Sequence, residues 1–330
     1  MAIYLDGTVN FGGTAEATPV EGDLWYDSGK FCFGTSLTFV GAWSSGGNLG
    51  TSGDALAGAG TQTAGLCMGG PLALRSTVTE EYNGTSWSAG GNLGTGRRNP
   101  AGAGTQSAGL CMGGKSSAEY YEDVTEEYNG TSWSSGGNIA NARRQLAGAG
   151  TQSAGLCMGG RGSAVTNTNY TEEYNGTSWS SGGNMGTARY NLAGAGTQTA
   201  GLCMGGYSSN HGEYDVTEEY NGTSWSSADN LSNERENLAG AGTQSAGLCM
   251  GGSRQGGDDV QNVTEEYNGT SWSSGGNILT ARMQLAGAGT QSAGLCMGGM
   301  DNNYSEVNYT EEYNAGPGSY EELFTASAGV

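Results

Sequence analysis

The chain has 330 residues, and its 32 acidic residues outnumber its 12 lysines and arginines, so that its formal net charge is −20. Such a surface repels phosphate groups, which makes nucleic acids and anionic membranes poor candidate partners. No stretch approaches the roughly 20 apolar residues of a membrane helix, and residues 1–10 lack the basic and apolar parts of a signal peptide. We therefore expect a soluble cytosolic product without membrane insertion.

The N-terminal segment, residues 1–38, differs in sequence from the rest of the chain. Residues 23–33 predict a β-hairpin with Ser28 and Gly29 at its turn. The string P-V-E-G-D-L-W-Y-D at residues 19–27, followed by a short aromatic strand, resembles a segment frequently found in bacteriophage tail and fibre proteins. This resemblance implies an attachment or oligomerisation element of a virion protein. A hairpin that simply packs on the rest of the protein is the alternative.

The remainder of the chain is dominated by a passage of about 46 residues that occurs six times. Its best-kept part, A-G-L-C-M-G-G, begins at Ala64, Ala108, Ala154, Ala200, Ala246 and Ala293. Periods of about 40 to 50 residues indicate propellers or solenoids. Because such repeats bury surface only against their neighbours, we expect one repeat domain.

The repeat also explains the cysteines. Six of the seven cysteines occupy one repeat position, without a C-x-x-C pattern or a nearby histidine. This spacing argues against zinc sites and disulfides, so we expect small buried apolar residues and no metal. We also expect no cofactor.

Each repeat predicts four short strands, since its segments are bounded by Gly and Asn and show no helical period. In the fourth repeat we expect these strands at residues 192–196, 200–206 and 216–220 and around Trp225. Asn221 and Gly222 predict the two-residue turn before the last strand. The Ala, Gly and Cys of the first two strands suit the crowded centre of a propeller. Tyr and Trp of the last two are expected between neighbouring blades.

Several of these residues resemble the kelch motif: Arg189 and Leu192, the pair Gly205 and Gly206, Glu219 and Tyr220, and Trp225. The resemblance covers residues 43–314 in six copies and implies a kelch-like β-propeller. The first copy departs from the pattern. It has Gly53 and Asp54 where the other five copies carry Arg97, Arg143, Arg189, Arg235 and Arg282.

The two ends of the repeat region complement each other. The last copy ends with residues 310–314 and lacks a fourth-strand tryptophan, whereas Trp43 precedes the first complete copy. A closed ring has no exposed sheet edges. We therefore predict an all-β fold, a six-bladed propeller of four-stranded blades closed by the N-terminal strand around Trp43. The expected domains are residues 1–38, the propeller at residues 39–314 and a C-terminal tail at residues 315–330.

Little in the sequence points to catalysis, because an active site needs a few unlike residues and this chain offers one set in six copies. The single histidine, His211, is expected to be a solvated loop residue. Each T-E-E-Y contains a pair of glutamates, which could serve glycoside hydrolysis. Adjacent strand residues point to opposite faces. We therefore expect one glutamate of each pair in solvent and the other in a structural ion pair with Arg97, Arg143, Arg189, Arg235 or Arg282.

The copies diverge between G-G and T-E-E-Y, at residues 71–78, 115–124, 161–170, 207–216, 253–263 and 300–309. These segments connect the second and third strands, so we expect them on one face of the propeller. Variable loops on a rigid frame are typical of binding surfaces. The alternative is that the sequences of exposed loops diverge without a binding function. The residues that we expect to bind a glycan or protein are Tyr120, Tyr121, Asn167, Asn169, Tyr170, Tyr207, Asn210, His211, Tyr214, Asn302, Asn303 and Tyr304.

These observations lead to three hypotheses. The first is a non-enzymatic virion protein, a bacteriophage tail, fibre or capsid-decorating component within an oligomeric assembly. Its N-terminal segment would contact other virion proteins, and its loops would bind a host-surface glycan or protein. The second is an intracellular kelch-like scaffold for protein interactions. The third is a carbohydrate-active enzyme of the sialidase or glycosidase type.

Overall fold

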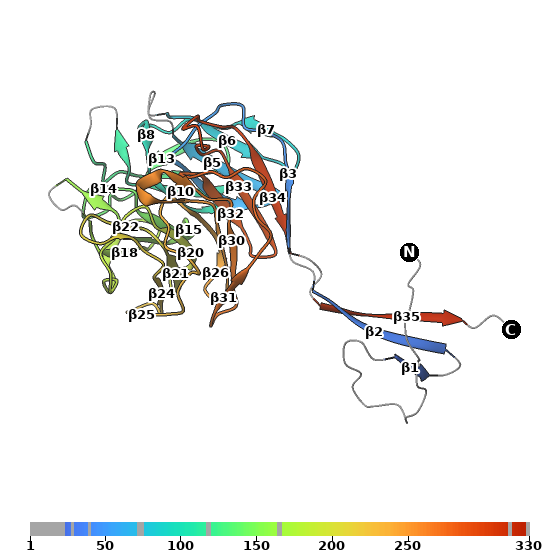
Figure 1. Ribbon diagram of the computed structural model, residues 1–330. Coiled ribbons are helices and arrows are strands. Elements are labelled where there is room, and N and C mark those ends of the chain that lie inside the picture. Colours follow the sequence, from blue (N-terminus) through green and yellow to red (C-terminus); the bar gives the residue numbers. More distant parts are fainter. Residues whose placement is uncertain are drawn as a thin grey trace. The chain divides into compact units, whose positions relative to one another are not determined.

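The computed structural model describes residues 24–27, 30–38, 41–70, 76–116, 120–163, 167–315 and 319–327 (Figure 1). The chain divides into two compact units. One contains Met1–Val40 together with Gly316–Val330, and the other is Gly41–Ala315.

The smaller unit is a three-stranded antiparallel sheet in the order β1 (Leu24–Asp27), β2 (Lys30–Thr38) and β35 (Ser319–Ser327) (Figure 1). Pairing of β1 with β2 confirms the expected hairpin, and its turn residues 28 and 29 lie outside the described residues. Residues 315–330, expected as a tail, instead contain β35, which pairs with all of β2. The hairpin alone would leave one edge of β2 unpaired, and β35 pairs along that edge.

The larger unit is a propeller of six four-stranded antiparallel blades, as predicted (Figure 1). The first strands of blades 1 to 6 are β4 (Leu56–Thr61), β9 (Ala101–Thr105), β15 (Ala147–Thr151), β20 (Ala193–Thr197), β26 (Ala239–Thr243) and β32 (Ala286–Gly289). The second strands are β5 (Ala64–Gly69), β10 (Ala108–Met112), β16 (Ala154–Met158), β21 (Ala200–Met204), β27 (Ala246–Met250) and β33 (Ala293–Met297).

The outer half of each blade carries the aromatic residues. The third strands are β6 (Thr79–Tyr82), β12 (Thr125–Tyr128), β18 (Thr171–Tyr174), β24 (Thr217–Tyr220), β30 (Thr264–Tyr267) and β34 (Thr310–Asn314). The fourth strands are β7 (Trp87–Ala89), β13 (Trp133–Ser135), β19 (Trp179–Ser181), β25 (Trp225–Ser227), β31 (Trp272–Ser274) and, in blade 6, β3 (Ala42–Ser45). In the fourth repeat these strands begin within one residue of the predicted positions.

The first strands form a closed circle in which each contacts the next and β32 contacts β4. Their alternating glycines permit this close approach. A Cβ atom added at Gly102 would lie 2.6 Å from the carbonyl oxygen of Gly58 in the preceding blade, and one at Gly148 would lie 2.5 Å from that of Gly102. The Ala-Gly repetition is therefore what allows six strands to meet around one axis.

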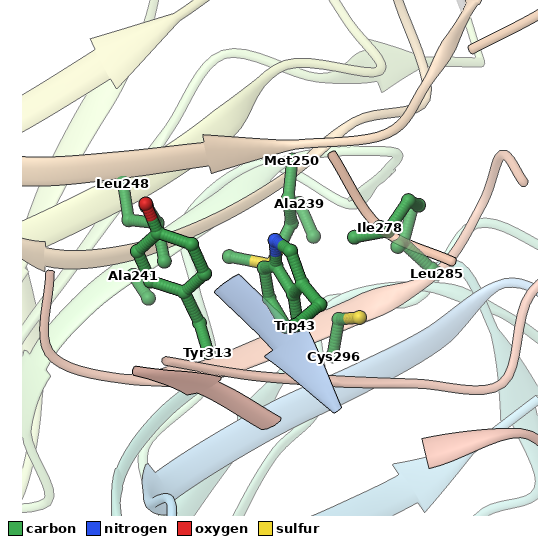
Figure 2. Close-up of a cluster of buried hydrophobic side chains, with 9 residues drawn as sticks. All are labelled: Trp43, Ala239, Ala241, Leu248, Met250, Ile278, Leu285, Cys296 and Tyr313. Atoms are coloured by element: carbon green, nitrogen blue, oxygen red, sulfur yellow. The ribbon is translucent and has the colours of Figure 1, made fainter. Parts of the chain in front are cut away.

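The ring closes through the N-terminal strand. In blade 6, β3 pairs with β34, and Trp43 lies opposite Tyr313 with their ring centroids 5.0 Å apart. Figure 2 shows both rings packed among side chains of blade 5, including Leu248 and Met250. The indole Nε1 of Trp43 donates a hydrogen bond to Oγ1 of Thr264 in blade 5, at 2.9 Å. The predicted closure is confirmed.

Every interface between blades repeats the same hydrogen bonds. Between blades 1 and 2, the Tyr128 hydroxyl donates to Glu81 at 2.5 Å, and Trp133 Nε1 donates to Thr79 Oγ1 at 2.9 Å. Nε2 of Gln106 donates to two carbonyl oxygens, those of Gly65 at 3.0 Å and Tyr82 at 2.7 Å. The same three contacts join blade 1 to blade 6 through Tyr82, Trp87 and Gln62. The interfaces are therefore both apolar and hydrogen-bonded.

Candidate binding face

The variable segments lie beside the linkers that enter each blade. Short antiparallel pairs join β8 (Arg97–Arg98) to β11 (Lys115–Ser116) and β14 (Arg143–Arg144) to β17 (Arg161–Gly162). Two further segments fold on themselves. β22 (Tyr207–Ser208) pairs with β23 (Gly212–Glu213), and β28 (Ser253–Arg254) pairs with β29 (Asp259–Val260) across the 3-10 turn η1 (Gln255–Gly257). We call this surface the loop face.

Neighbouring loops of blades 4, 5 and 6 contact one another. Glu213 of blade 4 accepts a hydrogen bond from the backbone N–H of Gly256 in blade 5, at 2.6 Å. The hydroxyl of Tyr304 in blade 6 donates to Asp258 of blade 5 at 2.9 Å. These loops therefore form a continuous surface along one side of the ring.

Exposed aromatic side chains concentrate on this surface. Among the described residues, the large hydrophobic side chains that remain exposed are Tyr120 at 70%, Tyr304 at 54%, Tyr309 at 41% and Tyr170 at 37%, all in variable segments, and Leu279 at 59% in the linker to blade 6. Tyrosine offers a rigid apolar ring and a hydroxyl with few rotatable bonds, which suits recognition.

Other aromatic residues brace the loops. The guanidinium of Arg144 lies 5.5 Å and the ammonium of Lys115 5.9 Å from the ring of Tyr121. In blade 4, Tyr207 packs on Tyr190 with centroids 5.4 Å apart. These rings are half-buried or buried, so they position the loops more than they present themselves to a ligand.

The expected amide residues divide into two groups. Nδ2 of Asn167 donates to the carbonyl of Ala188 at 3.2 Å, and Nδ2 of Asn169 donates to that of Met185 at 3.0 Å, so both side chains tie their loop to the linker. By contrast, Asn210, Asn302 and Asn303 are exposed. Exposed amides can exchange water for the hydroxyl groups of a ligand.

His211 and Tyr214 form a stacked pair, with centroids 4.5 Å apart and an interplanar angle of 13°. His211 is exposed and Tyr214 is half-buried. This places the histidine at the surface of the loop of blade 4, where a flat ring pair is available for stacking.

A ring of linker residues at the axis was missed by the sequence analysis. The backbone N–H of each ring residue donates to the carbonyl of the ring residue in the preceding blade at 2.8–3.0 Å, and all have positive φ between 52° and 57°. These residues are Ala55, Asn99, Gln145, Asn191, Asn237 and Gln284. They line a cavity of about 80 Å³ with the leucines or proline that follow them. Asn tolerates this conformation better than most residues, which is the signal that could have identified the ring.

The axial cavity and the loops belong to one side of the propeller. In blades 2 to 6, the residue before the ring residue pairs with a variable segment: Tyr190 forms a bridge with Tyr207, and Glu236 forms one with Ser253. Nδ2 of Asn191 donates to Glu236 at 2.7 Å. Burial raises the pKa of the Glu236 carboxyl, the hydrogen bond from Asn191 opposes this rise, and Glu213 adds to it. The loop face therefore surrounds a polar cavity whose rim differs from blade to blade.

The charged residues that recur from copy to copy form contacts within the propeller. Each of the five expected arginines forms an ion pair with the first glutamate of the pair in its blade, in the combinations Arg97–Glu126, Arg143–Glu172, Arg189–Glu218, Arg235–Glu265 and Arg282–Glu311. The second glutamate was expected in solvent, but it accepts the tyrosine hydroxyl of the next blade, as Glu81 does from Tyr128. The donating tyrosine comes from the neighbouring blade, so the sequence of a single repeat does not indicate this contact.

No protein-family model matches this chain, and no curated protein matches it. Within the described ranges, no three His, Cys, Asp or Glu side chains come together in an arrangement that could hold a metal ion. No helix of the described residues has the length and apolar character to cross a membrane.

Proposed function

We propose that this protein is a non-enzymatic structural and adhesion component of a bacteriophage particle, which binds a host-surface glycan or protein through its loop face. The observation that carries the proposal is the position of the exposed aromatic side chains. The copies agree where residues hold blades together, and Tyr120, Tyr170 and Tyr304 project where the copies differ. A frame of fixed contacts with dissimilar exposed loops is suited to recognition.

The virion assignment rests on the N-terminal segment. Residues 19–27 resemble a segment of bacteriophage tail and fibre proteins, and we propose that the repeats are kelch-like. In this proposal the small sheet of β1, β2 and β35 attaches the propeller to other virion proteins, because β1 contains part of the resembling segment. The net charge of −20 favours protein and glycan partners over nucleic acid.

A binding assay on host-envelope extract and on a glycan array tests the recognition proposal. We expect the wild-type protein to bind a restricted set of glycans or one envelope protein, and the double variant Tyr120→Ala/Tyr304→Ala to lose most of this binding. Ser88→Ala, an exposed position on β7, is the matched control and should bind like wild type. Equal binding by the double variant, no binding by wild type, or hydrolysis of a bound glycan would each contradict the proposal.

Antibody labelling of purified phage particles in the electron microscope tests the location. We expect label on the particle surface. Label that remains only in the host cytoplasm would instead favour the intracellular scaffold.

A further inference from the structure

Blades 2 to 6 each enclose the guanidinium of the arginine that precedes their first strand. In blade 4, Nη1 of Arg189 donates to the carbonyl oxygens of Gly205 at 2.9 Å and Val216 at 2.5 Å, and Nη2 donates to Glu218 at 3.1 Å. The guanidinium groups of Arg97, Arg235 and Arg282 make the same set of contacts, and that of Arg143 keeps the ion pair. All five arginine side chains are at most 1% exposed.

Blade 1 lacks this side chain, because Gly53 stands at the position of Arg189. The surrounding acceptor groups are nevertheless retained. Glu80 accepts hydrogen bonds from the backbone N–H groups of Gly50 at 2.7 Å and Thr51 at 3.1 Å. In blade 4, Glu218 accepts equivalent bonds from Gly186 at 2.6 Å and Thr187 at 3.3 Å.

The backbone around the position is also retained. The N–H of Gly69 donates to the carbonyl of Val78 at 3.0 Å, as that of Gly205 donates to Val216 at 3.1 Å. The two carbonyls that accept from the guanidinium in blade 4 therefore have counterparts in blade 1, those of Gly69 and Val78, and the carbonyls of Val78 and Val216 accept the same backbone hydrogen bond.

A small cavity of about 10 Å³ lies at the position of the missing side chain. Its walls include Gly53, Cys67, Gly69, Val78 and Glu80. Thr51 and Ser52 also line it and are exposed, so the cavity lies next to the surface. Glu80 is only 7% exposed, and among the ion pairs of the described part of the chain none includes Glu80.

The pKa of the Cys67 thiol is shifted by burial and by a carboxylate, and no arginine is among the causes of the shift. Burial, and after it the charge of Glu80, raises the pKa of the Cys67 thiol. In blade 4 burial raises the pKa of Cys203 to about 11, and there the charge of Arg189 opposes the rise.

We propose that the cavity of blade 1 is a binding site for a guanidinium group, supplied by a small guanidino compound or by the arginine side chain of a partner. The ligand would donate to the carbonyls of Gly69 and Val78 and pair with the carboxylate of Glu80. A planar guanidinium matches a carboxylate and two carbonyls better than a spherical ammonium does. The same molecule contains four filled examples of this arrangement, at Arg97, Arg189, Arg235 and Arg282, and a fifth arginine, Arg143, that keeps the ion pair, which is why a guanidinium is the ligand that we name.

The site will bind weakly. Its enclosed space is about 10 Å³, which is room for one water-sized group. A guanidinium must therefore displace the exposed wall at Thr51 and Ser52. We expect a millimolar dissociation constant for a free ligand, and tighter binding where a partner adds contacts outside the cavity.

The test is a titration of the full chain with methylguanidinium, followed by the amide NMR signals of Thr51, Gly53 and Gly69. Methylammonium at equal ionic strength is the ligand control. We expect saturable shifts for methylguanidinium and at least tenfold weaker shifts for methylammonium. A short peptide with one central arginine distinguishes a partner side chain from a free compound, since it should bind more tightly only if a partner is the source.

Three variants make the result decisive. Gly53→Arg supplies the side chain in the same chain and should abolish the shifts, whereas Arg189→Gly should create a second site and change the stoichiometry from one to two. Arg75→Gln removes the arginine that directly precedes Ser76 in sequence. Shifts that occur only in Arg75→Gln would mean that the chain itself occupies the site, which would overturn the proposal of an external ligand. No saturable shift in wild type, or shifts unchanged by Gly53→Arg, would overturn it as well.

Discussion

The strands of the blades and the loop face differ in how strictly one copy resembles the next. In the strands, the contacts between blades recur from one interface to the next, so Tyr128 on Glu81 and Tyr174 on Glu127 are the same contact at two interfaces. On the loop face, neighbouring segments meet through unlike pairs, such as Glu213 with Gly256 and Tyr304 with Asp258. Contacts that repeat around a ring restrict every copy to the same residues, and contacts made once do not.

This difference predicts that the strand residues determine the stability of the propeller and that the loop residues determine what it binds. Changes in the strands should act at a blade interface and alter unfolding. Changes in the loops should leave unfolding alone and alter binding.

Raising the pH should break the strand contacts at all six interfaces together. Burial, and after it the hydrogen bond to Glu173, raises the pKa of Tyr220 from its ordinary value of 10.0 to about 12. Burial and an equivalent hydrogen bond also raise the pKa values of Tyr82 and Tyr174 to about 12. A pKa raised by folding contributes stability that is complete below pH 10 and is lost as the pH rises through 12. We therefore expect cooperative unfolding between pH 10 and 12, measured by far-UV circular dichroism.

The matched pair Tyr220→Phe and Tyr120→Phe sharpens this prediction. The first removes a buried hydroxyl and should make the loss of stability with pH less steep. The second changes an exposed loop tyrosine and should leave the slope as in wild type. Equal slopes for all three proteins would show that the interface tyrosines do not govern alkaline unfolding.

Removing Trp43 should have the next largest effect. Trp43→Ala deletes a buried indole and its bond to Thr264, so we expect a loss of about 3–5 kcal/mol in the free energy of unfolding by urea. Trp133→Ala is the control, because Trp133 makes the same bond to Thr79 but is half-buried and follows its neighbouring strand without a break in the chain. A larger loss for Trp133→Ala than for Trp43→Ala would contradict the role of β3 as the closing strand.

Removing the hydrogen bonds of one interface glutamine should lower the free energy of unfolding by an intermediate amount. Gln106→Ala removes two hydrogen bonds from Nε2 to the preceding blade, and we expect a loss of about 1–3 kcal/mol. Gln106→Glu should cost more at neutral pH, since it places a carboxylate oxygen against two carbonyl oxygens, and should recover in part at low pH as the carboxyl becomes protonated. If both variants unfold like wild type, the glutamines do not hold the blades together.

The loop face should show the smallest effects on stability. Tyr120→Ala and Tyr304→Ala alter exposed side chains, and we expect changes within about 0.5 kcal/mol. Thermal unfolding followed by circular dichroism checks this. A loss of stability as large as that expected for Gln106→Ala would mean that the loops also stabilise the propeller.

Sequence reasoning located what the repeat itself determines. The closing strand at Trp43 followed from one missing and one surplus tryptophan, and the alanine and glycine positions of the first strands followed from crowding at an axis. It did not locate features that depend on a residue of the neighbouring blade or on the backbone conformation. The acceptor role of Glu81 requires Tyr128 from the next blade, and the axial ring of Asn99 and Gln145 depends on a left-handed backbone that a linker sequence shows only weakly.

The end of the chain shows the same limit. The sequence after residue 314 contains no repeat pattern, so its strand could not be assigned without its partner. In the structure its nine residues, Ser319–Ser327, are each paired with a residue of β2. Pairing between the two ends of a chain is a long-range property, which a local pattern cannot indicate.

The exchange of one loop tests the division between strands and loops most directly. Residues 207–216 of blade 4 would be replaced by residues 253–263 of blade 5, and the melting temperature and the host-envelope binding of the same sample would both be measured. We predict a melting temperature close to that of wild type together with altered or lost binding. A melting temperature far below that of wild type would contradict the account. So would wild-type melting and wild-type binding in every variant when each of the loops is exchanged in turn.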